Sequence, residues 1–271
     1  MSDYFGDAIS HRAQGVLFFH IQANTNDLLA DLAARIGWLG RPDVKRFYRD
    51  YARRRFGPET ADAMAESLEL FCDAVDFGPG NQAPYNLSLA LVFPGFGRSA
   101  EAELAECKET GEARKAWLRN RLGVIEPKAA TAGRALLAAR SAASRMKNEP
   151  FYQRYMFELD YTAARFEGIT NLYRAHLVAS EDPAQADRRF RRALAAFTSV
   201  KEMFRDLKGY HMSALRELEP AVPFTSAFLK DWETRGYWEP RSRWFHVVWE
   251  RLDEFEALVR GLRPKGLPAE E

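Results

Sequence analysis

Apolar residues recur at every third or fourth position along most of this chain, from about residue 24 to residue 262. That spacing matches the period of an α-helix and gives each helix one apolar stripe. The clearest stripe approaches a heptad repeat, which is typical of helices packed antiparallel in a bundle. Its members are Tyr155, Leu159, Thr162, Phe166, Ile169, Tyr173 and His176. The pattern predicts an all-α fold, a multi-helix antiparallel bundle.

Capping residues and helix breakers predict where the first helices begin and end. Asn24 or Asn26 can cap the first helix, which Gly40-Arg41-Pro42 ends. Asp43 can cap the second helix, and Gly57-Pro58 separates it from the third. In the second half of the chain, similar signals predict helices over roughly 99–121, from Pro127 to about Lys147, after Pro150, after Pro183, and over 211–218 between Gly209 and Pro220.

One segment does not fit the helical pattern. Residues 14–22 hold a short, apolar, β-prone run with Gly15 in front of it, which is typical of a strand buried on both faces. A buried strand needs neighbours for its backbone groups, and the sequence offers no second strong strand, with Leu87–Phe93 as a weak alternative. We therefore expect one short N-terminal strand in front of the helices.

A second interruption falls at residues 77–98, where glycines, prolines and aromatic residues replace the helical spacing. Such a segment is either an ordered connection between two helical subdomains or a functional loop packed over a cleft. The expected organisation follows from these breaks. It comprises a strand segment over 1–23, a first helical subdomain over 24–98, a long-helix bundle over 99–263 and a frayed tail over 264–271.

Charge and hydropathy exclude several classes of partner. The 39 basic and 38 acidic residues give a net charge of +1, so no overall field attracts nucleic acid or an anionic membrane. The runs at Arg53–Arg55 and Arg188–Arg192 are interpreted as solvated helix faces. No apolar run reaches the roughly 20 residues of a membrane span, and the N-terminus lacks a signal peptide. We expect a soluble, cytoplasmic protein, or a periplasmic or extracellular one if an N-terminal part is missing.

Local motifs give no support for a metal or a cofactor. None of the five histidines forms a zinc-type pair, and no phosphate-binding glycine motif occurs. His176 lies on an apolar stripe, which favours a hydrogen-bonded core histidine over a ligand. Cys72 and Cys107 are expected to be thiols without a disulfide. We predict no metal and no cofactor.

The stretch His20–Asp27 places neutral hydrogen-bonding side chains directly after the predicted strand. In barrel enzymes, side chains that contact the substrate gather at this end of each strand. Amide and imidazole groups suit the hydroxyls of a sugar. An alternative is structural, because Asn24 and Asn26 can cap the next helix and Gln22 can close the strand.

The first seventy residues resemble the end of a catalytic (β/α)8 barrel in bacterial glycoside hydrolases of the α-glucuronidase and N-acetylglucosaminidase types. The resemblance rests on Gly15–Ile21, on the helical segment Asn24–Trp38 and on Phe47–Gly57, which together cover about a quarter of the chain. The rest is similar only in being helical. The earlier strands of such a barrel, with the acids they usually carry, are absent from this sequence.

The resemblance implies a helical C-terminal module of a carbohydrate-active protein, which contributes to a sugar cleft rather than catalysing alone. If the chain is part of an enzyme, the resemblance implies a glycoside hydrolase, with no assignable catalytic pair. The partners would be a carbohydrate ligand and a barrel domain or other protein. The alternative is a stand-alone interaction or scaffold protein with residues 77–98 as a docking loop. The predicted sugar-binding residues are His20, Gln22, Asn24, Trp38, Asn81 and Tyr85.

Overall fold

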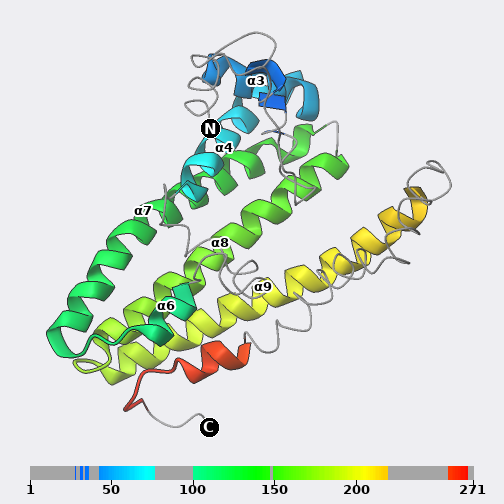
Figure 1. The fold of residues 1–271 in the computed structure, drawn as a ribbon. Helices are drawn as coiled ribbons and strands as arrows, with labels where there is room; N and C mark the ends of the chain where they lie inside the picture. The colour runs from blue at the N-terminus through cyan, green and yellow to red at the C-terminus, as the bar shows by residue number, and fades with distance from the viewer. Residues whose placement is uncertain are drawn as a thin grey trace, which may run out of the picture. The chain divides into compact units, whose positions relative to one another are not determined.

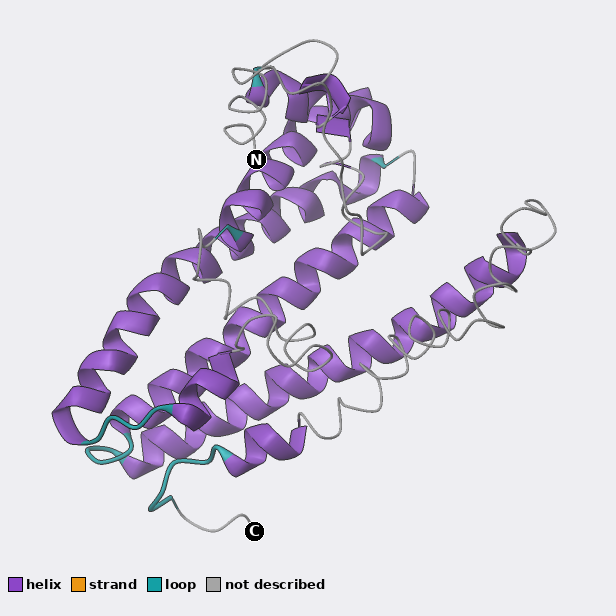
Figure 2. Ribbon diagram, in the orientation of Figure 1, coloured by secondary structure: helices purple, strands orange, loops and turns teal. Residues whose placement is uncertain are grey.

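The computed structural model describes Leu28, Asp31, Leu32, residues 34–36, 43–76, 100–146, 149–218 and 256–267. Across these residues the secondary structure is helical and contains no strand, so this part of the chain is all-α as predicted (Figure 2). The predicted strand over 14–22 lies outside the described residues, as does the weak strand candidate at Leu87–Phe93.

Helix α3 (Val44–Phe56) begins and ends where the sequence predicts. The Asp43 carboxylate caps it by accepting hydrogen bonds from the backbone N–H groups of Lys45 and Arg46, at 3.0 and 3.2 Å. Gly57 ends the helix with a φ of 104°, a conformation that favours glycine. After it come the 3₁₀ turn η1 (Pro58–Thr60) and α4 (Ala61–Val75).

Two compact units make up the chain, and each is described by itself. The first comprises residues 1–75 and 130–160, and the second comprises residues 76–129 and 161–271. The long helices α7 (Gly111–Ala142) and α8 (Glu149–Val178), labelled in Figure 1, each contribute residues to both units.

The core of the first unit is built from large apolar side chains of α3 and α4, together with small residues of α7 and tyrosines of α8. Phe47 and Phe56 are almost fully buried, and the Phe71 and Tyr155 rings meet edge to face at 5.9 Å. Ala135, Ala139 and Ala142 present the short side chains of α7 to this core. These alanines explain how bulky aromatic groups from the neighbouring helices are accommodated.

The second unit contains α6 (Ala100–Glu106), the first part of α7, the second part of α8, α9 (Pro183–Leu218) and a short helix at 256–261. The second part of α8 runs beside α9 in Figure 1, and the two helices are in close contact at Gly168, because a Cβ atom there would lie 2.6 Å from the Phe197 ring. The predicted stripe of α8 is confirmed, since every member except the half-buried His176 is buried.

Three predicted helix boundaries are wrong. The helix expected over 99–121 is broken, because α6 ends at Glu106 and α7 begins at Gly111, which has a φ of 54°. Helix α7 then continues through Pro127. The residue four positions earlier, Gly123, is exposed, so water can satisfy the carbonyl that loses its helical partner. Helix α9 likewise continues through Gly209 to Leu218, because one glycine costs a helix only about 1 kcal/mol.

Candidate functional site

Two buried hydroxyl groups, those of Ser67 and Tyr155, form hydrogen bonds that join α4, α7 and α8 in the first unit. The Ser67 hydroxyl donates to the Ala135 carbonyl at 2.7 Å and lies 3.0 Å from the Tyr155 hydroxyl. Because Ser67 has one proton and uses it at Ala135, Tyr155 donates to Ser67. Burial raises the pKa of Tyr155 well above its ordinary value, so the phenol keeps its proton. The directions of both hydrogen bonds are therefore fixed. These hydrogen bonds hold α4, α7 and α8 together.

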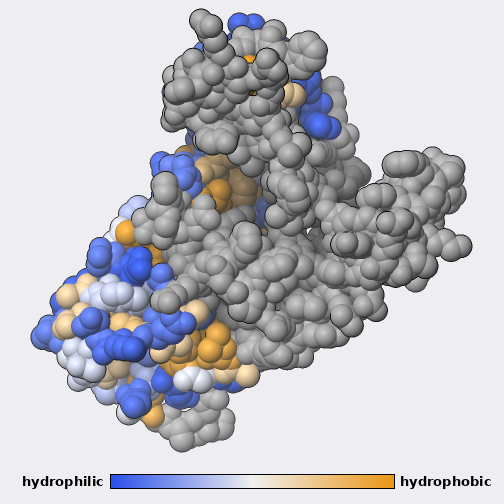
Figure 3. Space-filling model, in the orientation of Figure 1, coloured by the Kyte–Doolittle hydropathy of each residue, from blue (hydrophilic) through white to orange (hydrophobic). Residues whose placement is uncertain are grey.

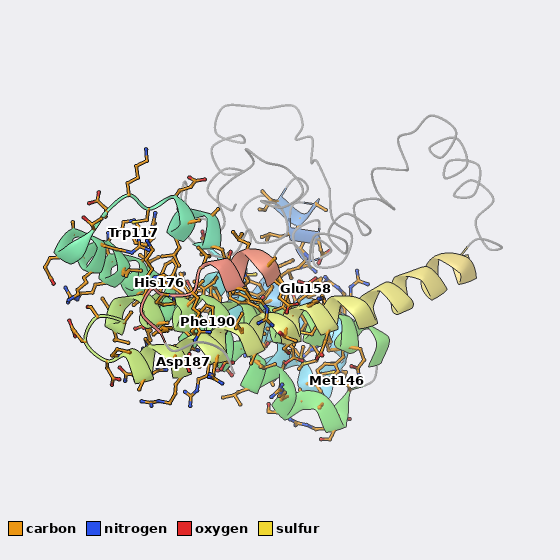
Figure 4. The ribbon with its side chains drawn as sticks, turned by 90° about the horizontal axis from the view of Figure 1, so that it is seen from below. Trp117, Met146, Glu158, His176, Asp187 and Phe190 are labelled. Carbon is orange, nitrogen blue, oxygen red and sulfur yellow. The ribbon has the colours of Figure 1, made fainter. Side chains whose placement is uncertain are left out.

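The first unit also holds an unpaired carboxyl group, that of Glu158 on α8, labelled in Figure 4. The side chain is half-buried and has no hydrogen-bond or ion partner among the residues that the structure describes. Burial raises its pKa to about 7, because no nearby positive charge offsets the loss of solvation. Glu158 is therefore an acid that exchanges its proton near neutral pH.

A buried ion pair lies in the second unit. Glu101 of α6 and Arg165 of α8 are 0% and 1% exposed and make a bidentate contact, in which Arg165 Nη2 donates to Glu101 Oε2 at 2.8 Å. The Phe197 ring covers the guanidinium at 5.5 Å. The Tyr173 hydroxyl donates to the Ala100 carbonyl at 2.9 Å. These contacts attach α6, which is too short to be stable alone, to α8.

The segment 256–263 of the same unit is held on α8 and α9 by four contacts. His176 Nε2 lies 2.7 Å from the Leu262 carbonyl, so this nitrogen carries the proton and donates. Arg263 pairs with Asp187 at 2.9 Å, and Lys201 pairs with Glu256 at 3.0 Å. The fourth contact is the Arg263 guanidinium over the Phe190 ring, at 5.7 Å; Phe190, His176 and Asp187 are labelled in Figure 4.

His176 is confirmed as a hydrogen-bonded side chain of the helical stripe. Burial lowers its pKa to about 4, against the opposing effect of the bond to the Leu262 carbonyl, and the positive charge of Arg114 lowers it further. The imidazole is therefore neutral at physiological pH. The hydrogen bond from His176 to the Leu262 carbonyl holds the segment 256–263 on α8, so the role of His176 is structural.

Each basic run contributes an arginine to an ion pair. Arg54 pairs with Asp31, and Arg191 pairs with Asp187 at 2.7 Å. The exposed face in Figure 3 accordingly shows hydrophilic residues interspersed with smaller apolar areas. Leu137, 67% exposed, is the most exposed large apolar side chain in the described part of the chain. It lies beside the exposed Arg134 and Arg140 on α7 and forms no apolar patch with them.

All six predicted sugar-binding residues lie outside the described residues, and so does the proposed docking loop at 77–98. The contacts described above therefore do not include the predicted sugar-binding residues or the docking loop. The groups that sequence reasoning missed are Glu158, Glu101 and Arg165. A signal existed for the two α8 residues, because Glu158 and Arg165 fall at helical spacing from Thr162, on the stripe that predicts the core.

Within the described part of the chain, no cluster of three or more histidine, cysteine, aspartate or glutamate side chains could hold a metal ion. None of the described helices combines the length and apolar character needed to cross a bilayer. In comparisons with known proteins, no family model, no curated protein and no solved structure matches this chain.

Proposed function

We propose that this chain is the helical C-terminal module of a carbohydrate-active, glycoside-hydrolase-like protein, and that it contributes to a sugar cleft rather than catalysing alone. The observation that supports this proposal most is the packing of the resembling segments. Residues from 24–38 and from 47–57 share one core, so two of the three resembling segments belong to a single physical unit.

The contacts between these segments involve the residues that carry the resemblance. Leu28, Leu32 and Ile36 are buried in the same core as Phe47 and Phe56. Ion pairs reinforce the packing on the surface, where Asp31 meets Arg54 and Arg35 meets Asp50.

The polar groups assigned to the cleft suit a neutral, hydroxyl-rich ligand. Amide side chains both donate and accept hydrogen bonds, and the rings of Trp38 and Tyr85 can stack on the apolar face of a sugar. Glu158, in the first unit, is a titratable acid that could take part in sugar chemistry. Its pKa of about 7 is of the kind that general acids of glycoside hydrolases have, although such hydrolysis needs a second carboxylate.

A thermal-shift screen of the intact chain tests the proposal. The panel contains uronic acids, N-acetylhexosamines and their short oligomers, with glycerol as a polyol control. A ligand at one hundred times its Kd stabilises the folded state by about 2.7 kcal/mol, which raises the midpoint measurably. We expect a rise with at least one sugar class and none with glycerol. An unchanged midpoint across the panel contradicts a sugar-binding surface in this chain.

A further inference from the structure

Two neighbouring polar side chains of α8 lie in the interior of the second unit. Thr162 and Arg165 of α8 are each only 1% exposed. Thr162 Oγ1 and Arg165 Nε make no hydrogen bond within the described part of the chain. The two residues are three positions apart on one helix, so their side chains leave α8 on the same face.

The contacts of Arg165 show which of its donors is unmet. Both terminal nitrogens point at the two carboxylate oxygens of Glu101. The Phe197 ring covers a face of the guanidinium, where no hydrogen-bond acceptor is needed. The Nε–H group therefore requires an acceptor in the plane of the guanidinium. The Thr162 hydroxyl needs a partner as well, and can either donate or accept.

A buried donor without a partner costs about 1–3 kcal/mol, and folded proteins rarely leave one unmet. We propose that one internal water molecule binds between Thr162 and Arg165, accepting from Nε–H and exchanging a second hydrogen bond with Oγ1. Both side chains leave α8 on the same face, and a water molecule makes two to four hydrogen bonds, so one water can serve both atoms.

Charge excludes an ion as the occupant. Glu101 already neutralises the guanidinium, so an anion would gain little and would face the carboxylate. A cation would meet the Nε–H donor head-on. Water carries no net charge and supplies the acceptor that Nε–H needs, and internal waters bound to buried polar groups are common in proteins.

The water has a positioning role. With Nε–H satisfied, the guanidinium is held in one orientation and keeps both terminal nitrogens on Glu101. Because Glu101 is the buried anchor of α6, the water indirectly stabilises the attachment of that helix to α8.

Replacing Thr162 with valine tests the proposal by the sign of its effect. Valine has the same shape without the hydroxyl, so Thr162→Val removes one partner of the water and should lower the thermal midpoint by about 2–4 °C. If the hydroxyl were simply unpaired, valine would leave the midpoint unchanged or raise it, which would overturn the proposal. Thr170→Val is the matched control, because Thr170 Oγ1 is also buried and unpaired among the described residues, but no second such atom lies three or four positions away on α8 to share a water with it. That variant should not lower the midpoint.

A crystal structure of the intact chain at high resolution gives a second, direct readout that does not depend on how the variant folds. The expected result is an ordered water about 2.7–3.2 Å from both Thr162 Oγ1 and Arg165 Nε. Electron density without a water between these atoms would contradict the proposal.

Discussion

At the scale of single residues, burial decides the chemistry of the charged groups. Among the described residues, Glu101 has a guanidinium beside it, that of Arg165. Glu158 has no such partner among them, and burial raises its pKa to about 7. Substitutions of these two acids should therefore affect the stability of the fold in different ways.

Glu158 should make the protein less stable as the pH rises. Its pKa in the folded state, about 7, lies above the ordinary value of 4.5. Its contribution is therefore fully present below pH 4.5 and is lost as the pH rises through 7. Glu158→Gln should match the native protein near pH 4.5 and be more stable at pH 8 by about 2–3 kcal/mol, measured by urea unfolding. Glu167→Gln, at an exposed position on α8, is the control. Parallel pH profiles for native protein and Glu158→Gln would contradict the assignment.

The Glu101–Arg165 pair should show the asymmetry of buried charges. Glu101→Leu leaves a buried guanidinium without its partner and should cost about 3–5 kcal/mol of unfolding free energy. The double variant with Arg165→Met should be more stable than Glu101→Leu alone, because neither charge is then buried. Glu103→Gln is the matched control, since Glu103 pairs with Arg121 near the surface, and it should cost less than about 1 kcal/mol. A loss below 1 kcal/mol for Glu101→Leu would show that Arg165 reaches water.

At the scale of helices, close packing rather than helix propensity sets how α8 meets α9. Glycine is normally a poor helix former, yet at Gly168 the absence of a side chain lets the Phe197 ring approach the backbone. Gly168 therefore allows close packing of α8 and α9 at a cost in helix propensity. Substitutions can separate the effect of packing from that of propensity.

Gly168→Ala should destabilise the fold by about 1–3 kcal/mol, because the new methyl group would overlap the Phe197 ring. Gly133→Ala on α7 is the control, since nothing lies within 4 Å of the added Cβ. That variant should stabilise the fold by about 0.5–1 kcal/mol through helix propensity. Chemical unfolding of both proteins measures the difference. A stabilised Gly168→Ala protein would show that the ring can move away at little cost.

The predicted helices succeed where apolar spacing and caps agree, as in the stretch from Asp43 to Val75 and in the stripe of α8. They fail at Pro127 and Gly209, because each residue is a local helix breaker that the helix around it tolerates. The sequence does not predict the break before Gly111, because the charged residues there are compatible with a helix. Whether a breaker ends a helix depends on whether water or packing compensates for the lost backbone hydrogen bond.

At the scale of the whole molecule, the helical class follows from sequence, but the pairing of polar groups does not. Arg165 and Glu101 are 64 positions apart, and local spacing carries no information about such a contact. The same applies to the Ser67–Tyr155 hydrogen bond, whose partners are 88 positions apart. The six residues predicted to bind sugar lie outside the described part of the chain, so their grouping stays a prediction.

Calorimetric titration of the intact chain, with the sugar selected by the thermal-shift screen, tests the proposed role in a sugar cleft most directly. Asn81→Ala should weaken binding about tenfold, since a lost hydrogen bond to a ligand costs about 1–1.5 kcal/mol. Asn120→Ala, at an exposed position on α7, should bind like the native protein. Equal affinities for all three proteins would remove Asn81 from the cleft, and the absence of any binding heat from the native protein would contradict the proposed function.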